Sequence, residues 1–198
     1  MSHMTTDNYR KHTTTNPAQR FLIDNFFKNL LHEAGLLHPE SILDVGCGEG
    51  FTLDRFHTQL IGKKLVGIDF LDTAITIGKK ERPHLDLKKG NIYDIPFSDN
   101  SFDLVMCCEV LEHIDTPEKG LQELSRVTKK HCILSVPNEP WFMLSNFLRG
   151  KNLSRWGNDV EHIQHWSTNA FVKLVSKYFV VDAIRQPFPW TMLITSKR

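Results

Sequence analysis

A glycine-rich turn and a carboxylate further along the chain are the residues best suited to hold a ligand. The turn lies within the run LDVGCGEG at 43–50, and its three glycines in five residues let the backbone turn tightly and approach a ligand closely. The helix expected next presents its amino end, which favours a carboxylate or phosphate. Asp69 stands 23 positions after Gly46, where a carboxylate can accept both hydroxyls of a ribose. Together these features predict a nucleoside site.

The spacing of the glycines separates this turn from two other nucleotide-binding motifs. A dinucleotide-binding turn needs Gly-x-Gly-x-x-Gly, whereas here the third glycine comes one residue early and Phe51 occupies its expected place. The sequence contains no Walker A loop. Each Gly-Lys pair of the chain lacks both the upstream glycine and the following Ser or Thr that this loop requires. The pattern therefore disfavours a nicotinamide-dependent oxidoreductase and a P-loop nucleotidase.

Three histidines are candidates for a general base, because imidazole titrates near neutral pH. His113 follows the strand expected over 102–108, where either a base or a structural contact beside a cofactor fits. His162 and His165 lie in the run EHIQH and would share one face of a helix, as a base or as residues that orient the substrate. Two histidines at this spacing without a third clear ligand are more typical of hydrogen bonding than of a metal centre, so no metal is expected.

Strand-like and helical segments alternate along the chain, and this alternation would bring the candidate residues to one edge of a sheet. Apolar spacing predicts helices over 17–34, 50–60, 72–80, from 116 onward and 167–178. Strands are expected over 41–45, 64–68, 85–87, 102–108, 132–136, 179–185 and 190–196. Asp72, Thr116 and Ser167 are the expected helix caps. The order predicts an α/β fold with a mostly parallel, doubly wound sheet and a final strand pair, with ligands beyond the carboxyl ends of the strands.

Length and charge limit the partners of such a chain. Its 198 residues suit a single domain over 1–198, with a helical cover at 5–35 and an aromatic-rich substrate cap at 138–166. Lys and Arg number 24 against 23 Asp and Glu, so the net charge of +1 argues against nucleic-acid binding. No run of 18 apolar residues or secretory signal is present, so no membrane partner is expected and the expected location is cytoplasmic, with all four cysteines reduced.

Two further runs complete a recognisable set of motifs. GNIYDIPF at 90–97 precedes DNSFDLVMCCEVLEHI at 99–114, and both follow the glycine turn and Asp69 at the expected gaps. With these motifs the chain resembles the class I S-adenosylmethionine-dependent methyltransferases, specifically the small type 11 branch that includes ubiquinone and menaquinone methyltransferases. The likeness is dense over residues 41–136. It implies a Rossmann-like fold with a seven-stranded sheet, and S-adenosylmethionine as cofactor with S-adenosylhomocysteine as product.

The resemblance also implies roles for individual residues. Those near the methionine part of the cofactor would be Asp44, Gly46, Cys47, Gly48 and the backbone of Cys108. Asp69 would hold the ribose hydroxyls, Phe70 would pack on the adenine, and Asn91 and Ile92 would lie at the adenine edge. Many relatives carry Asp where this chain has Asn91. Arg20 would bind the carboxylate of the cofactor, although it stands one residue later than the arginine of a similar segment in ubiquinone-type relatives.

The implied activity is transfer of a methyl group to a small-molecule acceptor by in-line displacement. The short aromatic cap and the lack of a basic stripe favour a small acceptor over RNA or a protein surface. A catalytically inactive cofactor-binding subunit, or a protein or RNA methyltransferase, is the alternative. The acceptor atom stays open among oxygen, nitrogen, sulfur and carbon, and the sequence sets no oligomeric state.

Overall fold

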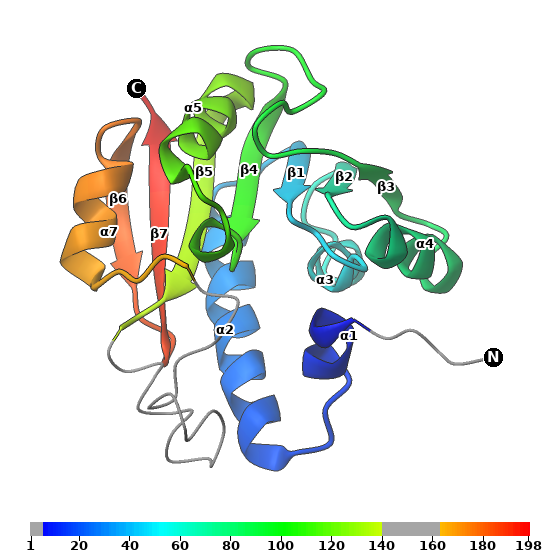
Figure 1. The fold of residues 1–198 in the computed structure, drawn as a ribbon. Coiled ribbons are helices and arrows are strands. Elements are labelled where there is room, and N and C mark those ends of the chain that lie inside the picture. The colour runs from blue at the N-terminus through cyan, green and yellow to red at the C-terminus, as the bar shows by residue number, and fades with distance from the viewer. Residues whose placement is uncertain (1–5, 140–162) are drawn as a thin grey trace.

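A seven-stranded sheet runs through the centre of the protein (Figure 1). The structure is a computed structural model, and it describes residues 6–139 and 163–198. The strand order is β3-β2-β1-β4-β5-β7-β6. The first five strands in this order, β3, β2, β1, β4 and β5, are all parallel to one another. Strand β7 pairs antiparallel with both β5 and β6. The predicted mostly parallel, seven-stranded sheet with an antiparallel final pair is thus confirmed.

Five strands match the expected apolar runs to within one residue at each end, whereas β5 begins four residues earlier and β3 ends two residues later than expected. The strands are β1 Ser41–Val45, β2 Lys64–Asp69, β3 Asp86–Lys89, β4 Phe102–Cys108, β5 Thr128–Pro137, β6 Phe179–Arg185 and β7 Trp190–Lys197. All but the last residue of β4 are buried. Central parallel strands are covered on both faces, which is why β4 reads as a continuous apolar run rather than as an alternating one.

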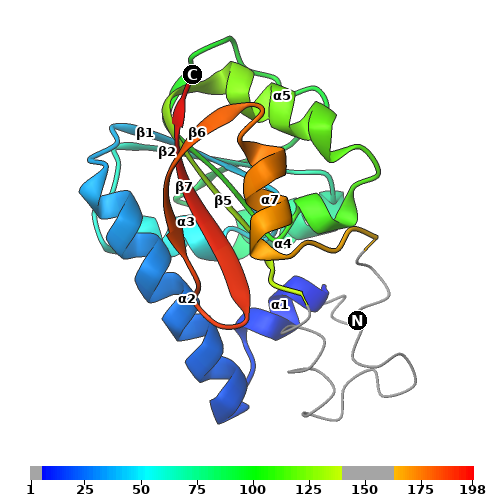
Figure 2. The same cartoon turned by 90° about the vertical axis from the view of Figure 1, so that its left-hand side faces the viewer.

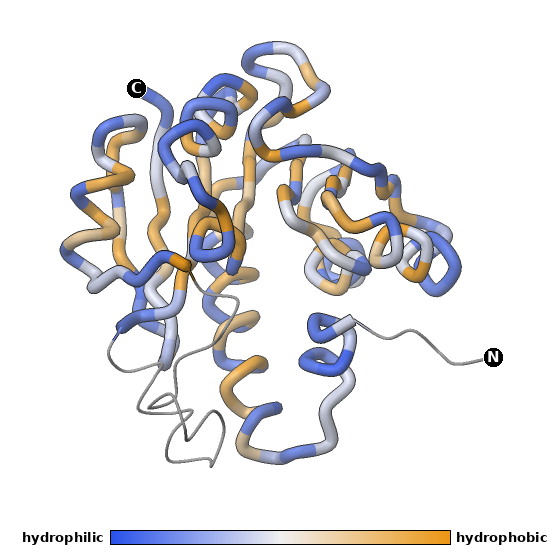
Figure 3. The backbone as a smooth tube through the Cα atoms, in the orientation of Figure 1, coloured by the Kyte–Doolittle hydropathy of each residue, from blue (hydrophilic) through white to orange (hydrophobic). Residues whose placement is uncertain are grey.

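Helices cover both faces of the sheet. They are α1 Asp7–His12, α2 Pro17–Leu36, α3 Phe51–Thr58, α4 Asp72–Glu81, α5 Pro117–Val127 and α7 Thr168–Val175, and a short 3₁₀ helix, η1, spans Leu111–His113. Figure 2 shows α2 on one side of the sheet and α5 and α7 on the other. One buried cluster joins the sheet to α5 and α7, and the other joins it to α2, α3 and α4. Apolar segments lie both in the sheet strands and on the helices that pack against them (Figure 3).

The three expected helix caps have different outcomes. The side chain of Ser167 accepts a hydrogen bond from the backbone of Ala170, as predicted for a cap. Thr116 occupies the cap position of α5, but its side chain makes no capping hydrogen bond. The prediction for Asp72 was wrong, because Leu71 is the cap residue of α4. Asp72 lies in the first helical turn and pairs with Lys89 of β3 instead.

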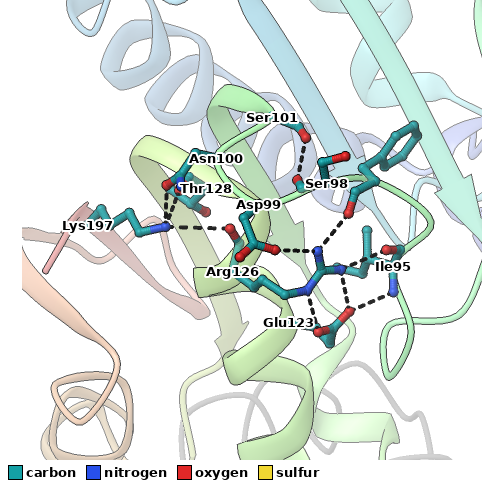
Figure 4. Close-up of polar contacts among 10 residues, drawn as sticks. Ile95, Ser98, Asp99, Asn100, Ser101, Glu123, Arg126, Thr128 and Lys197 are labelled. Atoms are coloured by element: carbon teal, nitrogen blue, oxygen red, sulfur yellow. Dashed lines mark hydrogen bonds and ion pairs between the residues drawn. The ribbon is translucent and has the colours of Figure 1, made fainter.

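An arginine on α5 fixes the connection between β3 and β4. Figure 4 shows Arg126 at the centre of this network. Its guanidinium donates to the carbonyl oxygens of Ile95 at 2.8 Å and Phe97 at 2.7 Å, and to Asp99 at 3.0 Å. Glu123, one helical turn earlier, pairs with Arg126 at 2.7 Å and accepts the N–H of Ile95 at 2.9 Å. These contacts attach the β3–β4 connection to helix α5.

None of the helices in the two described ranges combines the length and apolar character needed to span a bilayer.

Candidate functional site

A cleft of about 1800 Å³ lies at the carboxyl ends of β1, β2 and β4. Its walls include the ends of these strands, the segment after β3, and helix α1, which lies at the same end of the sheet (Figure 1). The strand order reverses between β1 and β4, with β2 on one side and β5 on the other. Ligands of open α/β sheets bind beside this reversal, so the fold places the cleft where a cofactor is expected.

The glycine turn after β1 forms the floor of the cleft. The N–H groups of Gly46 and Cys47 both donate to the carbonyl oxygen of Ile68, at 2.8 and 3.0 Å, which ties the turn to the end of β2. Gly46 has a φ of 80°, and a Cβ placed there would lie 2.2 Å from Cγ2 of Val110. Only glycine fits this backbone and this contact, so the sequence motif serves close packing around the ligand site.

Asp69 lies at the end of β2 and faces the same cleft. Its Oδ2 accepts the N–H of Gly48 at 2.7 Å, and its Oδ1 accepts the N–H of Leu71 at 2.8 Å. Burial raises the pKa of this carboxyl, although these backbone hydrogen bonds oppose the shift. A carboxylate oxygen has two lone pairs, so each oxygen retains one for a ligand hydroxyl.

Asp44 is the most unusual acid of the cleft. Its side chain is 3 % exposed, and its Oδ2 is buried with no hydrogen-bond partner among the described residues. Burial, and then the charge of Asp69, raise the pKa of Asp44 to about 7. An unpaired buried carboxylate is costly and is relieved when a cationic group pairs with it. The ammonium of the cofactor's methionine part has this charge, so the donor set fits S-adenosylmethionine.

The expected adenine side of the cleft is open to solvent. Phe70 is 68 % exposed and lines the cleft together with Asn91 and Ile92. Oδ1 of Asn91 accepts the backbone N–H of Tyr93 at 2.9 Å, which shapes the turn after β3. An exposed aromatic ring beside an amide side chain can stack on a planar base and hydrogen-bond its edge.

Two cysteines of the site are neutral thiols rather than nucleophiles. Cys47 and Cys108 both line the cleft, and neither forms a disulfide. Burial raises the pKa of each thiol well above its usual range. Because the thiolate is the reactive form of cysteine, these side chains contribute packing and backbone position only.

Arg20 lies apart from the other predicted cofactor residues. It is exposed on α2 and does not line the cleft. Helix α2 begins at Pro17 and buries Ile23 and Phe26, which leaves Arg20 on its solvent side. The cationic side chains that do line the cleft come from α1, namely Arg10 and Lys11. We therefore leave Arg20 out of the site.

Sequence reasoning missed α1 as a separate helix. Glu49 of the glycine turn is fully buried, and its carboxylate accepts hydrogen bonds from Thr6 and, at 2.6 Å, from Asn8. His12 stacks on the ring of Phe51, with 4.6 Å between ring centroids. Helix α1 has no buried residue and is hydrophilic (Figure 3), so apolar periodicity could not reveal it.

The sequence features that could have predicted α1 lie at the two ends of the helix. Thr6 caps the helix by accepting the N–H of Tyr9, and Asp7 lies in the first turn. Arg10, Lys11 and His12 form a basic last turn, which complements the helix dipole.

The three candidate bases have different placements. His113 lies in η1, lines the cleft and is exposed. His165 does not line the cleft; its Nδ1 lies 3.7 Å from Oε1 of Glu139. His162 and most of the expected cap, residues 140–162, lie outside the described residues. Across 6–139 and 163–198, no three His, Cys, Asp or Glu side chains are grouped to hold a metal ion.

Comparisons with known proteins agree with this geometry. Residues 43–136 match the type 11 family model, which is described as a methyltransferase domain. Demethylmenaquinone methyltransferase of Renibacterium salmoninarum is 35 % identical over 95 residues, which cover 48 % of this chain and 39 % of that protein. The chain therefore matches less than half the length of this relative.

Solved structures show the same fold at low sequence identity. An S-adenosylmethionine-dependent methyltransferase from Aquifex aeolicus has a TM-score of 0.71 at 17 % identity, over 98 % of this chain and 100 % of that one. Magnesium protoporphyrin IX methyltransferase from Synechocystis PCC 6803, solved with bound S-adenosylhomocysteine, has a TM-score of 0.69 at 15 % identity, over 93 % and 89 % of the two chains.

Proposed function

We propose that this chain is a class I S-adenosylmethionine-dependent methyltransferase of the type 11 branch and transfers a methyl group from that cofactor to a small-molecule acceptor. The observation that carries the proposal is the pair of carboxylates on either side of the glycine turn. Asp44 has a buried oxygen with no hydrogen-bond partner among the described residues, and Asp69 is held at the end of the neighbouring strand. One carboxylate suits a cationic group and the other suits hydroxyls.

The chain's own residues would hold the cofactor along the carboxyl edge of the sheet. Asp44 would pair with the ammonium group, the turn at 46–48 and the backbone of Cys108 would lie beside the methionine part, and Asp69 would accept the ribose hydroxyls. Phe70, Asn91 and Ile92 would contact the adenine. Helix α1, attached through Glu49, would cover this half of the cleft.

Bound S-adenosylmethionine supplies an electrophilic methyl carbon on a positively charged sulfur. The protein's main task is then to align the acceptor with that carbon for in-line displacement and to exclude water. His113, which faces the cleft, is our candidate to take a proton from the acceptor if the nucleophile carries one. We keep His165 and His162 as alternative candidates for this role.

An acceptor that is small and partly apolar fits the remaining walls. Phe26, Phe27 and Trp190 line the cleft beyond the glycine turn. The names of two similar proteins refer to a demethylated menaquinone and to a magnesium porphyrin, both of them small molecules. This agreement supports a small-molecule acceptor for the chain and leaves its identity to experiment.

Two measurements test the proposal. We expect calorimetry to give binding of S-adenosylmethionine and S-adenosylhomocysteine, and Asp44→Asn to weaken S-adenosylmethionine binding. We then expect an acceptor panel of phenols, quinols and amines to include a compound that converts the cofactor to S-adenosylhomocysteine. Lack of cofactor binding would refute the proposal. Binding without turnover of any acceptor would instead favour an inactive cofactor-binding subunit.

A further inference from the structure

We propose that Glu109 and Glu112 form a cation-binding site in the acceptor half of the cleft, and that it receives a protonated amine of the acceptor. The inference rests on the proposed function, because it assigns a chemical class to the acceptor of the same cleft. Both residues line the cleft, in the segment that directly follows β4.

Glu109 is held firmly at the end of β4. Its Oε1 accepts the hydroxyl of Ser135 at 3.3 Å, and its Oε2 accepts the indole N–H of Trp190. Its backbone has a φ of 61°, in the left-handed region that non-glycine residues rarely occupy. Strained backbone of this kind persists where the surrounding contacts enforce it and is concentrated at functional sites. The contacts here fix a carboxylate at the wall of the cleft.

Glu112 is the more deeply buried acid of the pair. Its side chain is 1 % exposed, and both carboxylate oxygens are buried without a hydrogen-bond partner in the described ranges. The nearest basic atom with a measured separation is Nε2 of His113, 4.0 Å from Oε1. The backbone is well held, because the carbonyl oxygen of Glu112 accepts the N–H groups of Ile163 and Gln164 at 3.0 and 3.1 Å. The burial of the carboxylate is therefore a fixed feature of η1.

The electrostatics of the pair favour a positive ligand. Burial raises the pKa of both carboxyls, and the charge of Glu109 raises the pKa of Glu112 further. The cations that act on them are Lys11, which lowers both pKa values, and His113, which lowers that of Glu109. Lys11 is engaged over the ring of Trp190, with its Nζ 5.5 Å from the ring centroid. The raised pKa favours the protonated form of each carboxyl, and an ammonium ligand paired with it would favour the ionised form.

The site is separate from the carboxylates assigned to the cofactor. Asp44 lies in β1, whereas both glutamates follow β4. The charge of Glu109 acts on Glu112. The cleft therefore holds two acidic groups, of which we assign Asp44 to the cofactor's ammonium; S-adenosylhomocysteine carries no sulfonium that would compete for the other. The second is left for the acceptor.

A protonated amine fits this second group better than a metal ion does. An ammonium group needs only hydrogen-bond acceptors and has three N–H donors to share between two carboxylates. A protein-held metal ion needs more ligands, and the described residues hold no group of three that could supply them. The neighbouring rings of Trp190 and Phe26, 5.2 Å apart between centroids, suit the carbon skeleton of an arylalkyl amine.

The test compares an amine with its alcohol analogue on the protein saturated with S-adenosylhomocysteine. The probes are 2-phenylethylamine and 2-phenylethanol, which differ in charge but little in shape. We expect calorimetry at pH 7.5 to show the amine binding at least tenfold more tightly than the alcohol. Glu112→Gln should reduce this ratio at least fivefold while leaving binding of the alcohol unchanged. The control, Glu118→Gln on the exposed surface of α5, should keep the wild-type ratio.

The outcomes separate this inference from the proposed function. Binding of S-adenosylhomocysteine is measured first, and its absence would refute both. If that binding is intact, equal affinities for the two probes, or no binding of either, would overturn the cation site alone. Stoichiometric binding of Mg²⁺ or Mn²⁺ that is lost in Glu112→Gln would also overturn it, in favour of a metal site. The melting temperature of Glu112→Gln is measured alongside, and a value equal to that of the wild type shows that the variant is folded.

Discussion

The carboxylate of Asp69 accepts the backbone N–H of Gly48, with 2.7 Å between Oδ2 and the nitrogen. This hydrogen bond joins the end of β2 to the glycine turn that follows β1. The residue that would hold the ribose and the turn that would lie beneath the methionine part are therefore one structural unit. A change in Asp69 alters both the hydroxyl acceptor and the shape of the turn.

We expect Asp69→Ala to weaken S-adenosylmethionine binding by about 1–3 kcal/mol, because the ribose hydroxyls lose a charged acceptor. Calorimetry measures the change, and Asp86→Ala on the exposed part of β3 is the matched control. Unchanged affinity in Asp69→Ala would remove this residue from the site.

Cofactor binding should depend on pH through Asp44. Its pKa of about 7 means that the carboxyl takes up a proton as the pH falls below neutrality, and the protonated form cannot pair with an ammonium group. We expect S-adenosylmethionine to bind about tenfold more weakly at pH 6 than at pH 7.5. Titration calorimetry at the two pH values measures this, and Asp44→Asn should remove most of the dependence. A pH-independent affinity in the wild type would contradict the role of Asp44.

The same carboxylate should reduce the stability of the ligand-free protein. A folded-state pKa above the unfolded value means that the native state binds more protons, so Asp44 costs stability as the pH rises from about 4 through 7. Asp44→Asn should therefore raise the melting temperature without cofactor by about 2 °C or more at pH 8, and the gain should disappear near pH 4. A lower melting temperature at pH 8 would show that Asp44 makes a stabilising contact in the free protein.

The parts of the fold that depend on short-range patterns could be predicted from the sequence. The central strands are apolar runs bounded by turns, so β1 and β4 fall at the expected residues. The positions of Asp44 and Asp69 beside the cleft could be predicted, because motif and strand end coincide. The order of the strands follows from element alternation combined with the family resemblance rather than from any single residue.

The contacts that depend on long-range packing could not be predicted. Helix α1 is polar and short, and it is held by Glu49, more than forty positions away in the chain. Arg20 matched a motif approximately, but the register of α2 leaves it exposed. The burial of Glu112 is likewise invisible in sequence, because an acidic residue after a strand is usually solvated.

The Arg126 network should contribute measurably to stability. Arg126→Met removes two hydrogen bonds to carbonyl oxygens and the ion pairs with Glu123 and Asp99. We expect a loss of about 1–3 kcal/mol in the free energy of unfolding, measured in urea, because partly buried carbonyl acceptors lose a charged donor. Arg126→Lys should recover only part of it, since an ammonium cannot reproduce the planar fork. A loss below about 0.5 kcal/mol in Arg126→Met would show that the connection is held by other contacts.

Measurements of kcat, rather than of cofactor affinity, should identify the histidine that acts as the general base. His113 faces the cleft and is exposed, whereas His165 lies near Glu139 outside the cleft wall. With an acceptor identified, we expect His113→Ala to lower kcat about 100-fold, with S-adenosylhomocysteine affinity unchanged within a factor of two. His165→Ala should lower kcat less, and His32→Ala on the exposed side of α2 should not change it. Loss of the acidic limb of the pH–rate profile in His113→Ala would separate proton transfer from a purely structural effect. Full activity in the His113 and His165 variants would mean that the acceptor reacts without a histidine base at either position.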